Sequence, residues 1–214
     1  MENNNFLQAV ILAGGRGERL KPITNSIPKP MAPINQIPFL DYLISSIYQV
    51  GINNILILVG YKSSIIIDRY KKMKNIKFSV GTEFDETGRR LLNAYNQLND
   101  NFLFVYGDNY WPIELEKMKQ NFNKLNVSVT TTVFSNKNGT GEYGYKNNIK
   151  VGSNGLVVKY DKKRQTQDAN GVDIGYFLMN KGVLNPQISD NVSFELDILP
   201  ILIEEKKTWS IFYR

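Results

Sequence analysis

Short apolar runs alternate with helix-forming segments through the first two-thirds of the chain. The runs are continuous rather than alternating, which is typical of strands buried on both faces of a parallel sheet. Pro38 to Val50 shows helical spacing of its apolar residues, with a proline at its start and Gly51 just past its end. This alternation predicts a mostly parallel sheet covered by helices on both faces. The expected strands are 10–12, 55–59, 76–80, 102–106 and 127–134, and the expected helices are 38–50, 63–72, 87–98 and 113–125.

The pattern changes after Ser135, where a polar loop is followed by shorter strands with period-two character. Strands at 146–151, 156–160 and 172–179 are expected to pair antiparallel and form a small lobe. A helix at 194–205 and a strand at 208–213 complete the chain. No repeat or linker interrupts it, so we expect one domain over 1–214, divided into a first part, 1–135, and a second part, 136–214.

Composition narrows the chemistry. The 214 residues include neither cysteine nor histidine. This excludes disulfides, thiolate nucleophiles, Cys-ligated metals and any imidazole acid or base. Catalysis would have to rest on carboxylates, lysine, arginine, backbone and metal.

The net charge is +6, but lysine and arginine are spread out rather than clustered with aromatic residues. This favours a small polyanionic substrate over nucleic acid. No apolar run reaches the ~20 residues of a membrane span. The polar start, Met1 to Asn5, is unlike a secretory leader, so we expect a cytoplasmic protein that binds no membrane. A homo-oligomer is compatible with the sequence, although the apolar face of 38–50 reads as core.

A glycine-rich turn follows the first strand, and two cations come soon after it. Gly14, Gly15 and Gly17 leave backbone N–H groups uncovered, which makes a concave anion site. Arg19 offers a planar fork of donors, and Lys29 is a point charge held between two prolines. The spacing is neither a Walker loop nor a dinucleotide fingerprint. The sequence therefore predicts a site for a nucleoside triphosphate.

Asp108 directly follows the apolar run 102–106. A carboxylate at the carboxyl end of a central strand points into the ligand crevice of an open α/β sheet. A single hard carboxylate suits Mg²⁺, which completes its shell with phosphates and water. We therefore expect Asp108 to hold Mg²⁺.

The segments 11–24 and 27–34 resemble the signature of sugar-1-phosphate nucleotidylyltransferases, especially the guanylyltransferases acting on mannose 1-phosphate and heptose 1-phosphate. The resemblance implies a Rossmann-like three-layer α/β fold, with a mixed but mostly parallel sheet and a small antiparallel sugar-side lobe. It also implies transfer of a nucleotidyl group from an NTP to a sugar 1-phosphate, for surface polysaccharide precursors. Arg19, Lys29 and Asp108 would be catalytic, with Asp108 binding Mg²⁺. The nucleotide would contact Leu12, Ala13, Gly14, Gly15, Arg16 and Gly17.

The resemblance places base recognition at Glu83, Thr87 and Gly88. A carboxylate accepts two hydrogen bonds from the edge of guanine, which favours GTP. The segment 87–91, however, is similar to a segment of glucose-1-phosphate cytidylyltransferases, so CTP stays an alternative.

The resemblance also assigns the sugar phosphate. Gly144, Asp161 and Lys162 match family elements that hold the sugar and its phosphate, although glutamate is usual where Asp161 stands. Asp173 is expected either to bind a sugar hydroxyl or approach the metal, or to be a buried structural aspartate.

Two further sets of residues are expected to be structural. Arg89 and Arg90 are interpreted as surface helix residues, and Glu195 and Asp197 as capping charges.

Two alternatives belong to other classes. A non-catalytic nucleotide-sugar sensor would explain why the 214 residues lack the family's second metal-binding aspartate. A glycosyltransferase would share the architecture, but it would want Asp-x-Asp where this chain has Asp108-Asn109-Tyr110.

Overall fold

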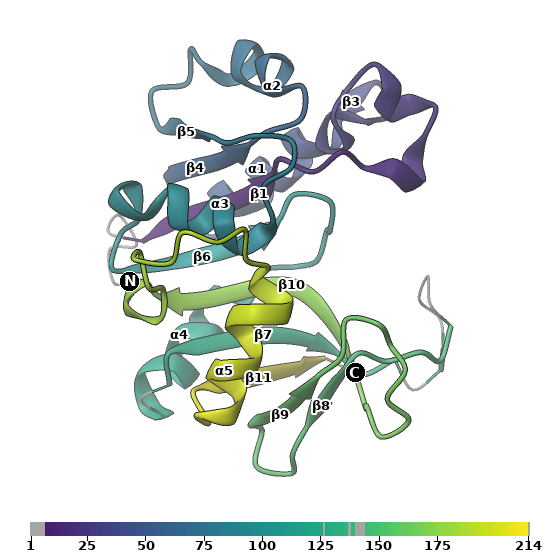
Figure 1. Cartoon of the computed structure of the whole chain (residues 1–214), viewed down its shortest axis with the longest axis vertical. Helices are drawn as coiled ribbons and strands as arrows, with labels where there is room; N and C mark the ends of the chain where they lie inside the picture. The colour runs from purple at the N-terminus through teal and green to yellow at the C-terminus, as the bar shows by residue number, and fades with distance from the viewer. Residues whose placement is uncertain (1–6, 126, 137, 140–143, 214) are drawn as a thin grey trace.

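The computed structural model describes residues 7–125, 127–136, 138–139 and 144–213. Within these ranges, a seven-stranded sheet runs in the order β11-β7-β10-β6-β1-β4-β5 (Figure 1). Its strands are β1 (Gln8–Ala13), β4 (Asn54–Val59), β5 (Ile76–Val80), β6 (Asn101–Tyr106), β7 (Val129–Phe134), β10 (Val172–Asn180) and β11 (Thr208–Tyr213).

Helices cover both faces of this sheet. The helices are α1 (Phe39–Gln49), α2 (Ser63–Tyr70), α3 (Thr87–Asn93), α4 (Leu115–Leu125) and α5 (Leu199–Glu204). One buried cluster joins the sheet to α1, α2 and α4, and a second cluster joins it to α3 and α5. Alternate residues of β1 feed the two clusters: Ala9 and Ile11 pack into the first, and Val10 packs into the second. The predicted three-layer arrangement is confirmed.

Parallel pairing brings the carboxyl ends of three strands to one edge. Strand β1 pairs in parallel with β4 on one side and β6 on the other. In register, Ala13 lies beside Val59 and Leu12 beside Tyr106. The chain runs from β1 to β4 and β5 and then returns to β6 across β1, so this edge contains the point where strand order reverses. Ligands of open α/β sheets bind at such a point.

Strand β10 departs from the sequence-based expectation. We expected 172–179 in the small antiparallel lobe, and this is wrong: β10 lies inside the main sheet, antiparallel to both β6 and β7. The period-two character of the segment predicted a strand with one exposed face, yet Asp173 and Gly175 are both buried. The small lobe is instead the pair β8 (Ile149–Val151) and β9 (Val157–Tyr160), which pair antiparallel as expected.

Several short elements complete the fold. The predicted helix 87–98 ends at Asn93 and gives way to a 3-10 turn, and the predicted helix 194–205 begins with a π-helical turn before α5. No helix among the described residues is long and apolar enough to cross a membrane. The remaining elements are η2 (Glu18–Leu20), η3 (Ile23–Asn25), η4 (Lys29–Met31), β2 (Pro33–Ile34), β3 (Ile37–Pro38), η5 (Tyr95–Gln97), η6 (Lys181–Val183) and η7 (Phe194–Ile198).

Candidate active site

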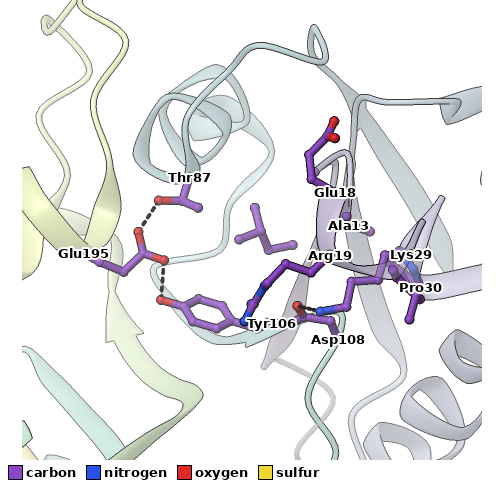
Figure 2. A pocket seen from close by; sticks show the side chains of 13 residues that line it. Ala13, Glu18, Arg19, Lys29, Pro30, Thr87, Tyr106, Asp108 and Glu195 are labelled. Atoms are coloured by element: carbon purple, nitrogen blue, oxygen red, sulfur yellow. Dashed lines mark hydrogen bonds and ion pairs between the residues drawn. The ribbon is translucent and has the colours of Figure 1, made fainter. Parts of the chain in front are cut away.

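A cavity of about 590 Å³ opens at the carboxyl ends of β1 and β6. Figure 2 shows Arg19, Lys29 and Asp108 on one side of it and Thr87 and Glu195 on the other. Its volume lies within the range of pockets that bind small-molecule ligands. The lining residues are Leu12, Ala13, Gly15, Gly17, Glu18, Arg19, Leu20, Lys29, Pro30, Thr87, Tyr106, Asp108 and Glu195.

The glycine turn forms one wall. Gly17 has a φ of +61°, and a Cβ built on it would lie 2.8 Å from the Cβ of Lys29. Gly15 is exposed, and a Cβ there would meet nothing within 4 Å. Gly17 is therefore required by the fold of the turn, whereas the space beside Gly15 is open to a ligand.

Arg90 donates hydrogen bonds to the backbone around this turn. We expected Arg90 on the surface, and this prediction is wrong. Its side chain is buried and donates to the carbonyl oxygens of Gly14 at 3.1 Å, Thr82 at 2.8 Å and Val59 at 3.3 Å. Burial lowers the pKa of Arg90, with the charge of Asp85 opposing the shift. Carbonyls at the ends of parallel strands are natural acceptors for a guanidinium, so Arg90 joins three segments around the turn. Arg89 is half-buried and donates to the carbonyl of Ile188 instead.

Lys29 and Asp108 form an ion pair, with Nζ 2.7 Å from Oδ2. Lys29 begins the 3-10 turn η4, and Pro28 and Pro30 on either side are buried. The two charged side chains keep 32% and 37% of their surfaces exposed toward the cavity they line. The structure thus brings together two of the predicted catalytic residues, and Arg19 lines the same cavity.

The described residues contain no group of three or more histidine, cysteine or acidic side chains arranged to hold a metal. Mg²⁺ in proteins takes one or two carboxylates and fills its shell with phosphate oxygens and water. Asp108 lines the same cavity as the glycine turn and would supply one such carboxylate.

Glu83 and Arg16 form a bidentate pair outside the cavity lining. Arg16 Nη2 lies 2.9 Å from Glu83 Oε1, and Nε donates to Oε2 at 3.1 Å. The Arg16 guanidinium also lies 4.8 Å from the centre of the Phe84 ring. The predicted base reader therefore contacts a predicted nucleotide-binding residue. Gly88 is buried, and a Cβ built on it would lie 2.8 Å from the carbonyl oxygen of Val192. Gly88 does not line the cavity.

The opposite wall centres on Glu195, which the sequence analysis interpreted only as a capping charge. Glu195 is only 5% exposed, yet it lines the cavity. It accepts hydrogen bonds from Thr87 Oγ1 at 2.5 Å and Tyr106 Oη at 2.8 Å (Figure 2). Burial acts to raise its pKa, but these hydrogen bonds and a nearby ammonium outweigh burial and lower the pKa below its ordinary value. Asp197, the neighbouring acid, accepts from the Ser193 amide at 2.6 Å and is a capping charge as expected.

Asp173 is buried beneath this wall. Its Oδ1 accepts from the Gly175 amide at 2.9 Å, and its exposed fraction is 8%. Burial raises the pKa of Asp173 to about 7; the hydrogen bond from Gly175 opposes the rise, and the charge of Glu195 adds to it. Gly175 has a φ of +81° and packs against the ring of Tyr106. Of the two alternatives for Asp173, its surroundings match the buried structural aspartate.

Of the predicted sugar-side residues, Lys162 contacts a residue of the cavity wall, whereas Asp161 makes its hydrogen bonds within a turn. Asp161 accepts from the amides of Lys163, Gln165 and Thr166, and these hydrogen bonds lower its pKa, the one from Thr166 most. It therefore shapes the turn after β9. Lys162 reaches Glu195, with Nζ 3.5 Å from Oε2.

Gly144 has a φ of +56°, and its carbonyl accepts from Asn136 at 2.8 Å, away from the cavity lining. Its neighbours Glu142 and Tyr143 lie outside the described residues.

Comparison with known proteins identifies the family. A family model described as nucleotidyl transferase matches residues 8–212. The chain belongs to this family. This confirms the resemblance to sugar-1-phosphate nucleotidylyltransferases that the glycine turn and the Pro-Lys-Pro segment suggested.

Two relatives and one solved structure show how far the similarity extends. A D-glycero-alpha-D-manno-heptose 1-phosphate guanylyltransferase of Campylobacter jejuni is 31% identical, over 88% of this chain and 83% of the relative. The bifunctional protein GlmU of Methanocaldococcus jannaschii is 30% identical over 96% of this chain, which spans about half (49%) of that relative. The crystal structure of HddC from Yersinia pseudotuberculosis has a TM-score of 0.79 at 25% identity, and the match covers 96% of this chain and 90% of that one.

Proposed function

We propose that this nucleotidyl transferase couples an NTP to a sugar 1-phosphate of the heptose or mannose type, releasing pyrophosphate and an NDP-sugar. The observation that carries the proposal is the ion pair between Lys29 and Asp108, which lies in one cavity with Arg19 and the glycine turn. Similarity to a heptose 1-phosphate guanylyltransferase supports the substrate class.

The chemistry suits a chain without histidine. A phosphate monoester has a second pKa near ~6, so its oxygen is already ionised at neutral pH and needs no general base. That oxygen forms a bond to the α-phosphorus of the NTP, and the bond from the α-phosphorus to the bridging oxygen of the β-phosphate breaks. The electron pair leaves with pyrophosphate. Catalysis is then mainly positioning and neutralisation of charge.

The lining residues divide this work. Backbone N–H groups from Gly15 to Gly17 would bind the triphosphate. Arg19 and Lys29 would stabilise negative charge on the transferring and leaving phosphates. Asp108 would hold Mg²⁺, which when bound supplies further positive charge at the α-phosphate. The Lys29 ammonium lies 2.7 Å from the Asp108 carboxylate, so this carboxylate contacts a cation even without the metal.

GTP is favoured as the donor, and CTP is a second candidate. Glu83 has two acceptor oxygens that suit the edge of guanine. Both oxygens of Glu83, however, already accept from Arg16, at 2.9 and 3.1 Å. CTP therefore stays a candidate donor, as the cytidylyltransferase-like segment 87–91 suggests.

The test is pyrophosphate release with Mg²⁺, each of the four common NTPs and a panel of sugar 1-phosphates that includes heptose and mannose. We expect release with GTP, and its loss in Arg19→Ala. Release with CTP alone would replace GTP in the proposal. Nucleotide binding without release from any pair would overturn the enzymatic proposal and favour the sensor.

A further inference from the structure

Glu195 is surrounded by donors from four separate segments. Its Oε2 accepts from Thr87 at the start of α3, at 2.5 Å, and from Ser193 Oγ, at 2.9 Å. Its Oε1 accepts from Tyr106 at the end of β6, at 2.8 Å. Lys162, in the turn after β9, places its ammonium 3.5 Å from Oε2. The carboxylate thus connects α3, β6, the turn after β9 and Ser193, the N-cap of its own helix η7.

These contacts use nearly all of the acceptor capacity of the carboxylate. An ionised carboxylate offers about four lone-pair sites, and four protein donors approach this one. Glu195 therefore has little capacity left to bind a substrate hydroxyl, although it lines the cavity. Its arrangement is that of a group that orients other side chains.

Among these donors, Lys162 has the most freedom. Its side chain is 42% exposed, and its Nζ lies 3.5 Å from both Glu195 Oε2 and Ser193 Oγ. A lysine side chain loses up to about 2 kcal/mol of rotamer entropy when it is fixed. A buried anion at the cavity wall reduces the range of positions that the ammonium samples. An ammonium has three N–H donors, so donors remain for an anionic ligand.

We propose that Glu195 is a positioning residue, which holds the Lys162 ammonium at the edge of the cavity so that Lys162 binds the phosphate of the sugar 1-phosphate. This inference rests on the proposed function. It assigns Glu195 its effect through Lys162 to the acceptor substrate, because the triphosphate-binding turn and Lys29 lie on the opposite wall (Figure 2). Glutamine at 195 keeps an oxygen that can accept from Thr87, the nucleotide-side residue that Glu195 contacts, so the nucleotide side should be unaffected.

The test is a double-mutant cycle with Glu195→Gln, Lys162→Met and the double variant, using GTP and mannose 1-phosphate. We expect Glu195→Gln to raise the KM for mannose 1-phosphate about tenfold and to leave the KM for GTP unchanged. If Glu195 acts through Lys162, its substitution has no further effect in the Lys162→Met background. Asp197→Asn is the matched control: it removes a neighbouring carboxylate that caps the same helix, and it should leave both KM values unchanged.

Two results would overturn the inference. One is an equal effect of Glu195→Gln with and without Lys162, which would make its role structural. The other is a rise in the KM for GTP alone. Should Glu195→Gln fail to fold, Glu195→Asp keeps the charge, draws it away from Lys162 and enters the same cycle.

Failure of the proposed function gives a different result. If the wild-type protein releases no pyrophosphate, the cycle is measured as the dissociation constant of mannose 1-phosphate by calorimetry. Coupling between the two positions in binding would support the inference although the enzymatic proposal had failed. Additive effects, or no binding by the wild-type protein, would overturn it.

Discussion

The Arg90 side chain packs against Gly14, and its Nη2 donates to the Gly14 carbonyl oxygen at 3.1 Å. A Cβ built on Gly14 would overlap the guanidinium, so Arg90 can occupy this position only beside a glycine. The same guanidinium reaches the carbonyl of Thr82, whose amide bonds to Asp85. The shape of the glycine turn therefore depends on a side chain 76 positions later in the chain.

Replacing Arg90 should separate turn geometry from general stability. We expect Arg90→Met to lower the free energy of unfolding by about 2 kcal/mol, because the buried carbonyls of Gly14 and Val59 and the partly buried carbonyl of Thr82 each lose a guanidinium donor. Arg90→Met should also raise the KM for the NTP, since the turn is no longer held. Arg89→Met is the matched control, because Arg89 donates to the 188–190 backbone instead. Urea unfolding and steady-state kinetics measure both effects; an unchanged NTP KM in Arg90→Met would contradict this role.

Two glycines of the turn should respond oppositely to alanine. At Gly17, φ is +61° and a Cβ would lie 2.8 Å from Lys29 Cβ, so Gly17→Ala should cost about 1 kcal/mol or more in stability. At Gly15 a Cβ meets nothing, so Gly15→Ala should fold normally but weaken NTP binding by filling space against the phosphates. Thermal unfolding and calorimetric titration with NTP distinguish the two; tight NTP binding by Gly15→Ala would argue against phosphate contact there.

Asp108→Asn should preserve the fold and abolish turnover. The side chain is 37% exposed and contacts Lys29, so its loss removes a surface ion pair worth less than about 1 kcal/mol. Turnover should fall about 100-fold or more, because the carboxylate that would hold Mg²⁺ is gone. Pyrophosphate release across a Mg²⁺ titration is the measurement. Asp68→Asn, which breaks the surface pair with Lys71, should leave turnover unaltered.

Asp173 should make stability depend on pH. Burial raises its pKa to about 7 from an ordinary value of 3.8, so the folded state binds the proton more tightly than the unfolded state. Its contribution is therefore most favourable below about pH 4 and is lost progressively as the pH rises to about 7. Asp173→Asn should be more stable than the wild-type protein at pH 8 and should lose that advantage at pH 4. Urea unfolding of both proteins at the two values measures this; an equal difference at both would refute the assignment.

The wall of the cavity formed by the glycine turn was largely predictable, because the sequence signals for it are local. Continuous apolar runs define β1, β4 and β6, and the residues that follow each strand must meet at one edge. This is enough to bring Gly15, Arg19, Lys29 and Asp108 into one cavity. The assignments of individual ligands to these residues stay predictions.

The opposite wall was not predictable in the same way, because its interactions join distant segments. Glu195 meets Thr87 across 108 positions, and nothing near Glu195 in the sequence distinguishes it from a capping charge. Arg90 was wrongly predicted to be exposed because an arginine on a short helix usually is. Its carbonyl partners come from three separate segments: the end of β4, the glycine turn and the turn after β5. The one local clue was Thr87-Gly88, since the buried Gly88 allows the backbone of α3 to approach Val192 closely.

The place of β10 in the sheet has a consequence for synthesis of the chain on the ribosome. Strand β6 has β1 on one side and β10 on the other, and β7 is paired only with β10 and β11 among the described strands. Residues 101–106 therefore keep one edge of the sheet open until residues 172–180 have emerged. A nascent chain that pauses before that point presents the unpaired backbone groups of β6 to other chains. Pairing of β10 with β6 therefore ends the period in which this edge can misassemble.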